Sequence, residues 1–186
     1  MNAQHQPTGS AYFLAKAEGS VESHTLSVIV DNEPGVLARV IGLFSGRGYN
    51  IESLTVSETE HEKHLSRITI VTRGLPTVIE QIRHQLERLV PVHRVSDLTR
   101  DYAGDVLERE LALVKVRGTG EARVEALRLA QAFGASTEDA TLTSFVFQLS
   151  GRSRTIDRFV AMMTEIGLVE VSRTGVAALG RGAEVM

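Results

Sequence analysis

The chain has 186 residues, 42% of them hydrophobic, which is enough for one large domain or two small ones. Its net charge of −3, with scattered Lys and Arg, argues against a nucleic-acid or anionic membrane partner. Its lack of cysteine excludes disulfides, thiolate metal sites and cysteine nucleophiles. Because it has neither a secretory signal pattern nor a run of about 20 apolar residues, the sequence predicts a cytoplasmic protein.

The first predicted unit spans residues 24–100, after a mobile tail predicted at 1–23. An apolar, β-branched strand at 26–30 ends at a dense turn signal at 31–35. The helix that follows has one apolar stripe and ends at two glycines; these residues are Val36, Leu37, Val40, Ile41, Phe44, Gly46 and Gly48.

The same unit continues with a predicted hairpin, a second helix and a fourth strand. The hairpin strands lie at 51–57 and 65–72, joined by a polar segment. The apolar stripe of the second helix covers 78–89, and the last strand covers 92–98. The order of elements is therefore βαββαβ.

A second predicted unit, at 106–175, repeats this order after a polar linker at 100–105. Its first strand, at 111–116, precedes a glycine turn and a helix. The apolar face of that helix is thin and consists of Val124, Leu127, Ala130 and Gln131.

The second half of this unit is predicted as a hairpin, a helix and a closing strand. The hairpin strands lie at 135–141 and 145–149, and the closing strand at 169–173. The helix between them has an i, i+3, i+4, i+7 stripe formed by Ile156, Phe159, Val160 and Met163. Residues 176–186 are predicted to be a C-terminal tail.

Two βαββαβ units predict an α+β fold with two ferredoxin-like units, each with helices on one face of its sheet. Such a fold serves RNA-binding modules, small enzymes, metal carriers and ligand sensors. Function must therefore be sought in particular residues.

Motifs for catalysis are missing, because the chain has no G-x-S-x-G, H-E-x-x-H or P-loop pattern. The best metal candidates, His61 and His64, lie in a polar hairpin that favours a solvated turn over a zinc site. Gly118 and Gly120 open a helix as in a dinucleotide loop, but Arg123 occupies the third glycine position of that fingerprint. We therefore predict no catalytic residue, no metal and no cofactor in this chain.

RNA binding is disfavoured by the third strand, at 65–71, which has no aromatic side chain on which a base could stack. Phe145 and Phe147 alternate along a strand of the second unit. Since they lack basic neighbours, a role in the core is favoured for both.

The strand–turn–helix at 31–37 is the strongest candidate binding site. A helix N-terminus has unpaired N–H groups and a partial positive charge, and Gly35 would let a carboxylate approach the main chain. Asn32 offers a donor and an acceptor for either end of an amino acid. Asn50 begins the next strand and is expected to lie nearby, across the sheet end. An ordinary helix start, with Pro34 and Gly35 as turn residues, is the structural alternative.

Two runs of sequence resemble a known family. The run NEPGVLARV, at 32–40, resembles the ligand loop and first helix of ACT domains. The longer run VIGLFSGRGYNIESLTV, at 40–56, is similar to the small regulatory subunits of acetolactate synthase. The resemblance covers residues 24–184 and both units, with further similarity at 65–67, 92–98, 109–116 and 172–175. The tail before residue 24 and the hairpin at 60–64 depart from the family pattern.

The resemblance implies a specific function for the chain. Its first unit would be an ACT domain, and the chain would be a non-catalytic subunit of a thiamine-diphosphate-dependent acetolactate synthase. It would bind the large catalytic subunit, raise its activity and confer feedback inhibition by valine in branched-chain amino-acid biosynthesis, with leucine and isoleucine as other effectors. Thiamine diphosphate, Mg²⁺ and FAD would belong to the large subunit. The second unit would help to dock or stimulate that subunit.

The resemblance also implies where the effector binds. ACT domains would pair in a homodimer, and the effector would lie between them against backbone N–H groups. The residues that match the family's effector site are Asn32, Gly35, Val36, Leu37 and Asn50.

Two other functions are weighed against this one. A free-standing ACT-type sensor would regulate a different enzyme or a transcription factor, but the sequence contains no DNA-binding helix pair. A small ferredoxin-like enzyme would need a convergent acid–base set, and no such set is recognisable.

Overall fold

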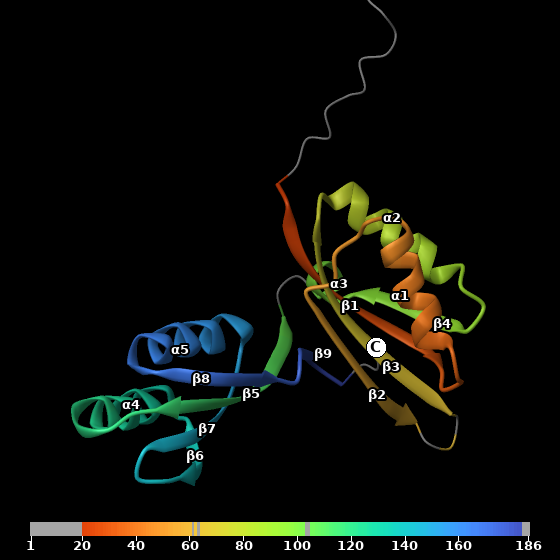
Figure 1. Ribbon diagram of the computed structural model, residues 1–186. Coiled ribbons are helices and arrows are strands. Elements are labelled where there is room, and N and C mark those ends of the chain that lie inside the picture. Colours follow the sequence, from red (N-terminus) through yellow and green to blue (C-terminus); the bar gives the residue numbers. More distant parts are fainter. Residues whose placement is uncertain (1–19, 61, 63, 103–104, 184–186) are drawn as a thin grey trace, which may run out of the picture.

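The structure, a computed structural model, describes residues 20–60, 62, 64–102 and 105–183. Within these residues the chain forms two α+β units side by side, so the predicted fold class is confirmed (Figure 1). The predicted tail at 1–23 lies mostly outside the described residues. Strand β1 (Glu22–Asp31) begins within its last residues, four positions before the apolar run that predicted it.

The first unit is a four-stranded antiparallel sheet with two helices on one face (Figure 1). Its elements after β1 are α1 (Val36–Gly46), β2 (Ser53–Glu60), β3 (Leu65–Gly74), α2 (Pro76–Glu87) and β4 (Val92–Asp97). The strand order is β2-β3-β1-β4, so β2 and β4 are the edge strands. The predicted order βαββαβ is therefore confirmed for this unit.

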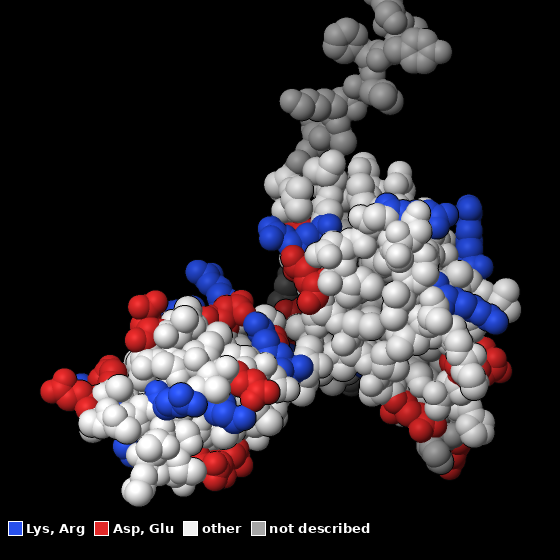
Figure 2. Space-filling model, in the orientation of Figure 1, with Lys and Arg blue, Asp and Glu red and all other residues white. Residues whose placement is uncertain are grey.

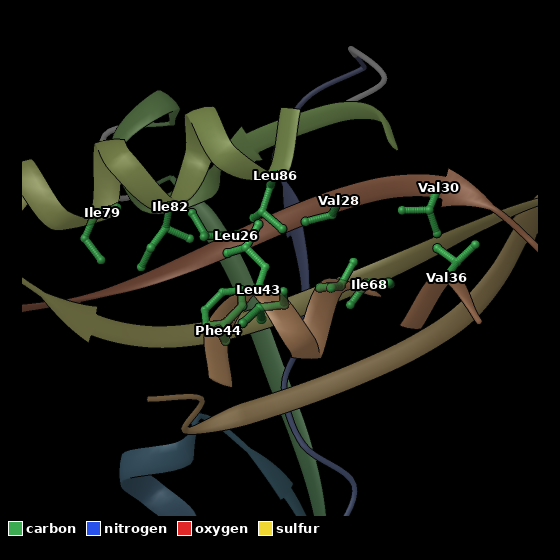
Figure 3. Close-up of a cluster of buried hydrophobic side chains, with 12 residues drawn as sticks. Leu26, Val28, Val30, Val36, Leu43, Phe44, Ile68, Ile79, Ile82 and Leu86 are labelled. Carbon is green, nitrogen blue, oxygen red and sulfur yellow. The ribbon is translucent and has the colours of Figure 1, made fainter. Parts of the chain in front are cut away.

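The core of the first unit forms where alternate residues of β1 face the helices. Leu26 and Val28 pair with Ile70 and Ile68 of β3, and all four are fully buried. The helices contribute residues from their apolar stripes, among them Val36, Val40, Phe44, Ile79, Ile82 and Leu86 (Figure 3). Each such side chain stabilises the fold by about 1.5–3 kcal/mol relative to exposure.

The second unit has the same plan. Its elements are β5 (Val106–Arg117), α4 (Gly120–Phe133), β6 (Ser136–Ala140), β7 (Ser144–Gly151), α5 (Ser153–Ile166), β8 (Leu168–Arg173) and β9 (Ala177–Gly180). The strand order is β6-β7-β5-β8, and β9 pairs with the first four residues of β5. Phe145 and Phe147 are buried in its core, as predicted.

Helix α4 buries a different face from the predicted one. Its buried residues are Ala126 and Ala130, whereas Val124 and Leu127 are 58% and 41% exposed. The prediction is confirmed for Ala130 but was wrong for Val124, Leu127 and Gln131, because it followed the large side chains. The sheet instead accepts the small alanines, and the larger side chains face solvent.

The junction between the units is more ordered than the sequence predicts. The helix α3 (Leu98–Asp101) begins directly after β4 and occupies the start of the predicted linker. The predicted C-terminal tail contains β9, whose Ala178 lies with Val176 in a small core beside Leu98. These segments carry little apolar periodicity, and they fold because each pairs with a distant part of the chain.

Candidate functional site

The turn between β1 and α1 has the backbone geometry expected of a site for a carboxylate. Gly35 has φ 89° and precedes a helix without a capping side chain in the described chain. The amides of the first helical turn lack intrahelical acceptors. A Cβ built on Gly35 would meet no atom within 4 Å, so the space above this residue is open. Asn32 is exposed beside it, and its backbone N–H donates to the backbone carbonyl of His64 at 2.7 Å.

Val36 and Leu37 follow Gly35 and face different sides of α1. The side chain of Val36 is buried in the core, so only its backbone could serve a ligand. Leu37 and Ile41 are 37% and 38% exposed on the side of α1 that turns away from α2. The turn is therefore bordered by an exposed aliphatic surface.

Asn50 lies at the other end of the sheet, which corrects the expectation that it lies near Asn32 in the same chain. Its carbonyl accepts a hydrogen bond from Thr72, near the end of β3. Asn32 instead lies beside Leu65, where β3 begins. The seven residue steps from Leu65 to Thr72 cover about 23 Å of strand. One copy of the chain therefore cannot bring both asparagines to one small ligand.

A cavity also lies between the two units, at a place where the sequence indicated no site. It is a cavity of about 790 Å³ lined by residues from both sheets, and by α5 and the segment before β9. At its wall the guanidinium of Arg173 donates to both carboxylate oxygens of Glu110 and to Asp157, and the Ser153 hydroxyl also donates to Glu110.

Glu110 is only 5% exposed. Burial alone would raise the pKa of its carboxyl group, but the hydrogen bonds from Arg173 and Ser153 outweigh it and hold the pKa below the usual 4.5. The opposing carboxylates raise the pKa of Arg173. The signal for this network was visible in the sequence. Glu110 stands in step with Ala112 and Val114 on the buried face of β5, where a charge requires a partner.

The segment before β9 connects the second unit to the first. The amide of Val176 donates to the Ser53 hydroxyl at 2.9 Å, and Gly175 lies directly against β2. On β1, which is separated from β2 by β3, the Thr25 hydroxyl donates to Glu108 of β5 at 2.6 Å. The strand that precedes the turn at Asn32 and Gly35 is thus hydrogen-bonded to the second unit.

Among the described residues, no group of three or more His, Asp or Glu side chains could hold a metal ion. His61 lies outside the described residues, so its candidacy as a ligand is not addressed. No described helix is long and apolar enough to cross a membrane.

Comparison with family models gives one match in each unit. Residues 26–94 match the ACT domain of acetohydroxyacid synthase small subunits (AHAS small subunit-like ACT domain), and residues 109–182 match the small subunit of acetolactate synthase.

Individual relatives agree with these matches over most of the chain. The chain is 48% identical to the acetolactate synthase isozyme 3 small subunit of Salmonella typhimurium, covering 87% of this chain and 97% of that protein. It is 43% identical to a probable small subunit from Archaeoglobus fulgidus, covering 86% and 97% of the two chains. A crystal structure of the small subunit from Thermotoga maritima superimposes with a TM-score of 0.76 at 33% identity, covering 88% and 99%.

Proposed function

The chain belongs to the family of acetolactate synthase small subunits, and from this premise we propose that it activates a catalytic large subunit and makes it sensitive to valine. The family and its ACT domain support a regulatory, non-catalytic role. A regulatory subunit of this family implies a large-subunit partner. Thiamine diphosphate, Mg²⁺ and FAD are proposed to reside in that partner, and the complex in the cytoplasm.

The observation that carries the proposal is the open, uncapped start of α1. The carboxylate of valine would accept hydrogen bonds from the first amides of α1, where the helix dipole also favours a negative charge. The side-chain oxygen of Asn32 would accept from the amino group. The exposed aliphatic surface at Leu37 is suited to a branched apolar side chain rather than to a charged one.

The separation of Asn32 from Asn50 supports a site shared between two copies of the chain. Strand β2 is an edge of the sheet, and two such edges can pair antiparallel around a two-fold axis. Antiparallel pairing sets the beginning of β2 in one copy beside its end in the other. Asn50 lies just before the beginning of β2, and the turn at Asn32 lies beyond its end, next to Leu65. Asn50 of one copy would thus approach Gly35 of the second copy.

The exposed residues of α1 support the same arrangement. Leu37 and Ile41 face away from α2, toward the β2 edge, so a second copy joined at β2 would cover them. We therefore propose a homodimer through the first unit, with two effector sites of Asn32, Gly35, Val36 and Leu37 from one copy and Asn50 from the other.

Two measurements with the purified full chain test this function. If valine binds only the folded form, it must raise the melting midpoint. At a valine concentration a hundredfold above the dissociation constant, the free energy of unfolding should increase by about 2.7 kcal/mol. Leucine and isoleucine are the related ligands, and glycine and lysine are the controls. Adding the chain to the cognate large subunit should raise acetolactate formation, and valine should lower it. If valine stabilises the chain no more than lysine does, the sensor function is wrong.

A further inference from the structure

A second surface that could bind a partner lies in the groove between α1 and α2 on the outside of the first unit. It is a depression of about 360 Å³ lined by Arg39, Leu43, Arg47, Gln85, Arg88 and Leu89. None of these lining residues is acidic. In Figure 2, basic side chains lie at the upper right of this unit, over its helices, and at its left edge beside acidic ones, and acidic side chains also lie at its lower end.

The three arginines of the groove have no carboxylate partner within the described part of the chain. Other arginines of the same unit are paired, since Arg83 and Arg100 bind Glu80 at 2.5 and 2.9 Å. The side-chain oxygen of Gln85, at the floor of the groove, is also buried without a hydrogen-bond partner among the described residues. The groove therefore holds three exposed cations and one unused polar group, although the chain as a whole carries a net charge of −3.

The spacing of these groups indicates the size of the ligand. Arg39, Leu43 and the C-cap residue Arg47 follow one another at intervals of four residues and so lie along one side of α1. They lie across from Gln85 of α2 and from Leu89, just after that helix. Arg39 and Arg47 are separated by about 12 Å along the helix axis. A single phosphate is too small to contact both arginines, whereas an extended peptide covers that distance in about four residues. A peptide also supplies N–H donors for the oxygen of Gln85 and aliphatic groups for the two leucines.

From these observations we propose that the groove binds an acidic segment of the catalytic large subunit. This inference rests on the proposed function, because it names the surface through which the regulatory chain reaches that partner. Carboxylates about four residues apart would meet Arg39 and Arg47, and a third would meet Arg88. The cations would steer the acidic segment toward the groove and fix its register.

The groove is compatible with the proposed homodimer, because the two surfaces lie on opposite sides of α1. Leu37 and Ile41 face the β2 edge, and Arg39 faces α2. Large-subunit binding and effector binding therefore use opposite sides of one helix. A shift of α1 on binding valine would reach the groove directly.

The test uses the full chain with the cognate large subunit. The variant carries Arg39→Glu, Arg47→Glu and Arg88→Glu, and its control is Arg94→Glu, an exposed arginine of the edge strand β4 that lies outside the groove. The measurement is the concentration of small subunit that gives half-maximal stimulation, at low and high salt. At low salt, the triple variant should need at least about tenfold more protein than the wild type for half-maximal stimulation, and this concentration should depend less on salt. The control should match the wild type.

Folding and effector binding are followed separately. All three substituted residues are exposed, so the melting midpoint and its rise with valine should be unchanged, and a triple Arg→Gln variant should show a smaller defect in stimulation. Stimulation of the triple Glu variant at wild-type concentrations would overturn the docking site. The docking site would also be overturned if pyrophosphate raised the melting midpoint only when the three arginines are present, while stimulation of the large subunit did not require them. If the wild type itself neither binds nor stimulates the large subunit, the proposed function fails instead.

Discussion

At the scale of single residues, Gly35 combines two properties that no other residue type offers at this turn. It adopts φ 89°, which other residues reach only with strain, and it leaves the space above the start of α1 open. The first property belongs to the fold, and the second belongs to the proposed effector site. Substitutions of Gly35 can separate its role in the fold from its role in the proposed site, because two replacements can impose the same backbone strain and differ only in charge.

We expect Gly35→Asp to abolish the response to valine while the chain still stimulates the large subunit. Its carboxylate would face that of the effector, and like charges about 4 Å apart repel by about 1 kcal/mol in water and more in a drier site. Since about 1.4 kcal/mol is a factor of ten, affinity should fall by one to several decades. The control is Gly35→Asn, which has the same shape and backbone strain without the charge. The readout is acetolactate formation with and without valine.

Mixing two variants tests whether the site is shared between copies. Gly35→Asp and Asn50→Ala each damage both sites of their own homodimer. In a mixed dimer of the two variants, one site would carry both changes and the other would be wild type. In an equal mixture about half of the dimers are mixed, and each mixed dimer has one intact site of two. The mixture should therefore recover about a quarter of the wild-type valine-binding capacity in calorimetry. Recovery of no capacity would place both residues in one copy, or Asn50 outside the site.

Glu110 is the residue whose ionisation contributes most clearly to the second unit. Its pKa in the fold lies below the usual 4.5, so its stabilising effect is complete above about pH 5 and is lost as pH falls through the lowered value. Replacing this buried acceptor by Gln should cost about 1–3 kcal/mol at pH 7. In urea unfolding, the difference in the free energy of unfolding between the wild type and Glu110→Gln should become smaller near pH 3. The exposed Glu165→Gln is the control, and a gap that stays constant with pH would contradict the assignment.

At the scale of elements, α1 has three distinct sides. One packs in the core through Val40 and Phe44, one faces α2 with Arg39, and one, turned away from α2, exposes Leu37 and Ile41. Apolar spacing alone merges the first and last sides, because both carry large aliphatic residues. The sheet decides which of them is buried within a single copy.

We expect Ile41→Glu to turn the proposed dimer into a monomer without unfolding it. The side chain is 38% exposed, so the charge is tolerated in one copy but not against a second one. Loss of the two symmetry-related isoleucines should weaken self-association by about 2 kcal/mol or more. Sedimentation at micromolar concentration is the measurement, and Val124→Glu, on an exposed position of α4, is the control. An unchanged dimer would mean that the chains pair elsewhere.

At the scale of the whole molecule, the two units are held together by the segment that precedes β9. Gly175 has φ 84°, and a Cβ there would lie 2.8 Å from the Thr55 hydroxyl and 2.9 Å from that of Ser53. The neighbouring Val176 is hydrogen-bonded to the same strand. A side chain at position 175 must therefore push the second unit away from β2.

Gly175→Ala should loosen the contact between the units at a cost of about 1–3 kcal/mol. Gly182→Ala is the matched control, since Gly182 also has a positive φ, of 99°, but nothing lies within 4 Å of its Cβ. Calorimetry should show two separated transitions for Gly175→Ala and one for the wild type and the control. If both glycine variants behave alike, strain rather than the contact with β2 is responsible.

Local pattern determined most of what is known about this chain. Period-2 and period-3.6 spacing located both βαββαβ units, and the runs around Gly35 and Asn50 carried the family resemblance that the comparisons confirm. These features depend on neighbours in sequence, which is why they could be recognised without a structure.

Tertiary structure decided the features that depend on residues far apart in the chain. It put Asn50 and Asn32 at opposite ends of one sheet, turned Ala126 rather than Val124 into the core, and paired β9 with β5 in the predicted tail. It also paired Glu110 with Arg173 and left Arg39 without a carboxylate partner among the described residues. Strand order and side-chain direction set these relations, and both arise only when distant segments compete for the same partners.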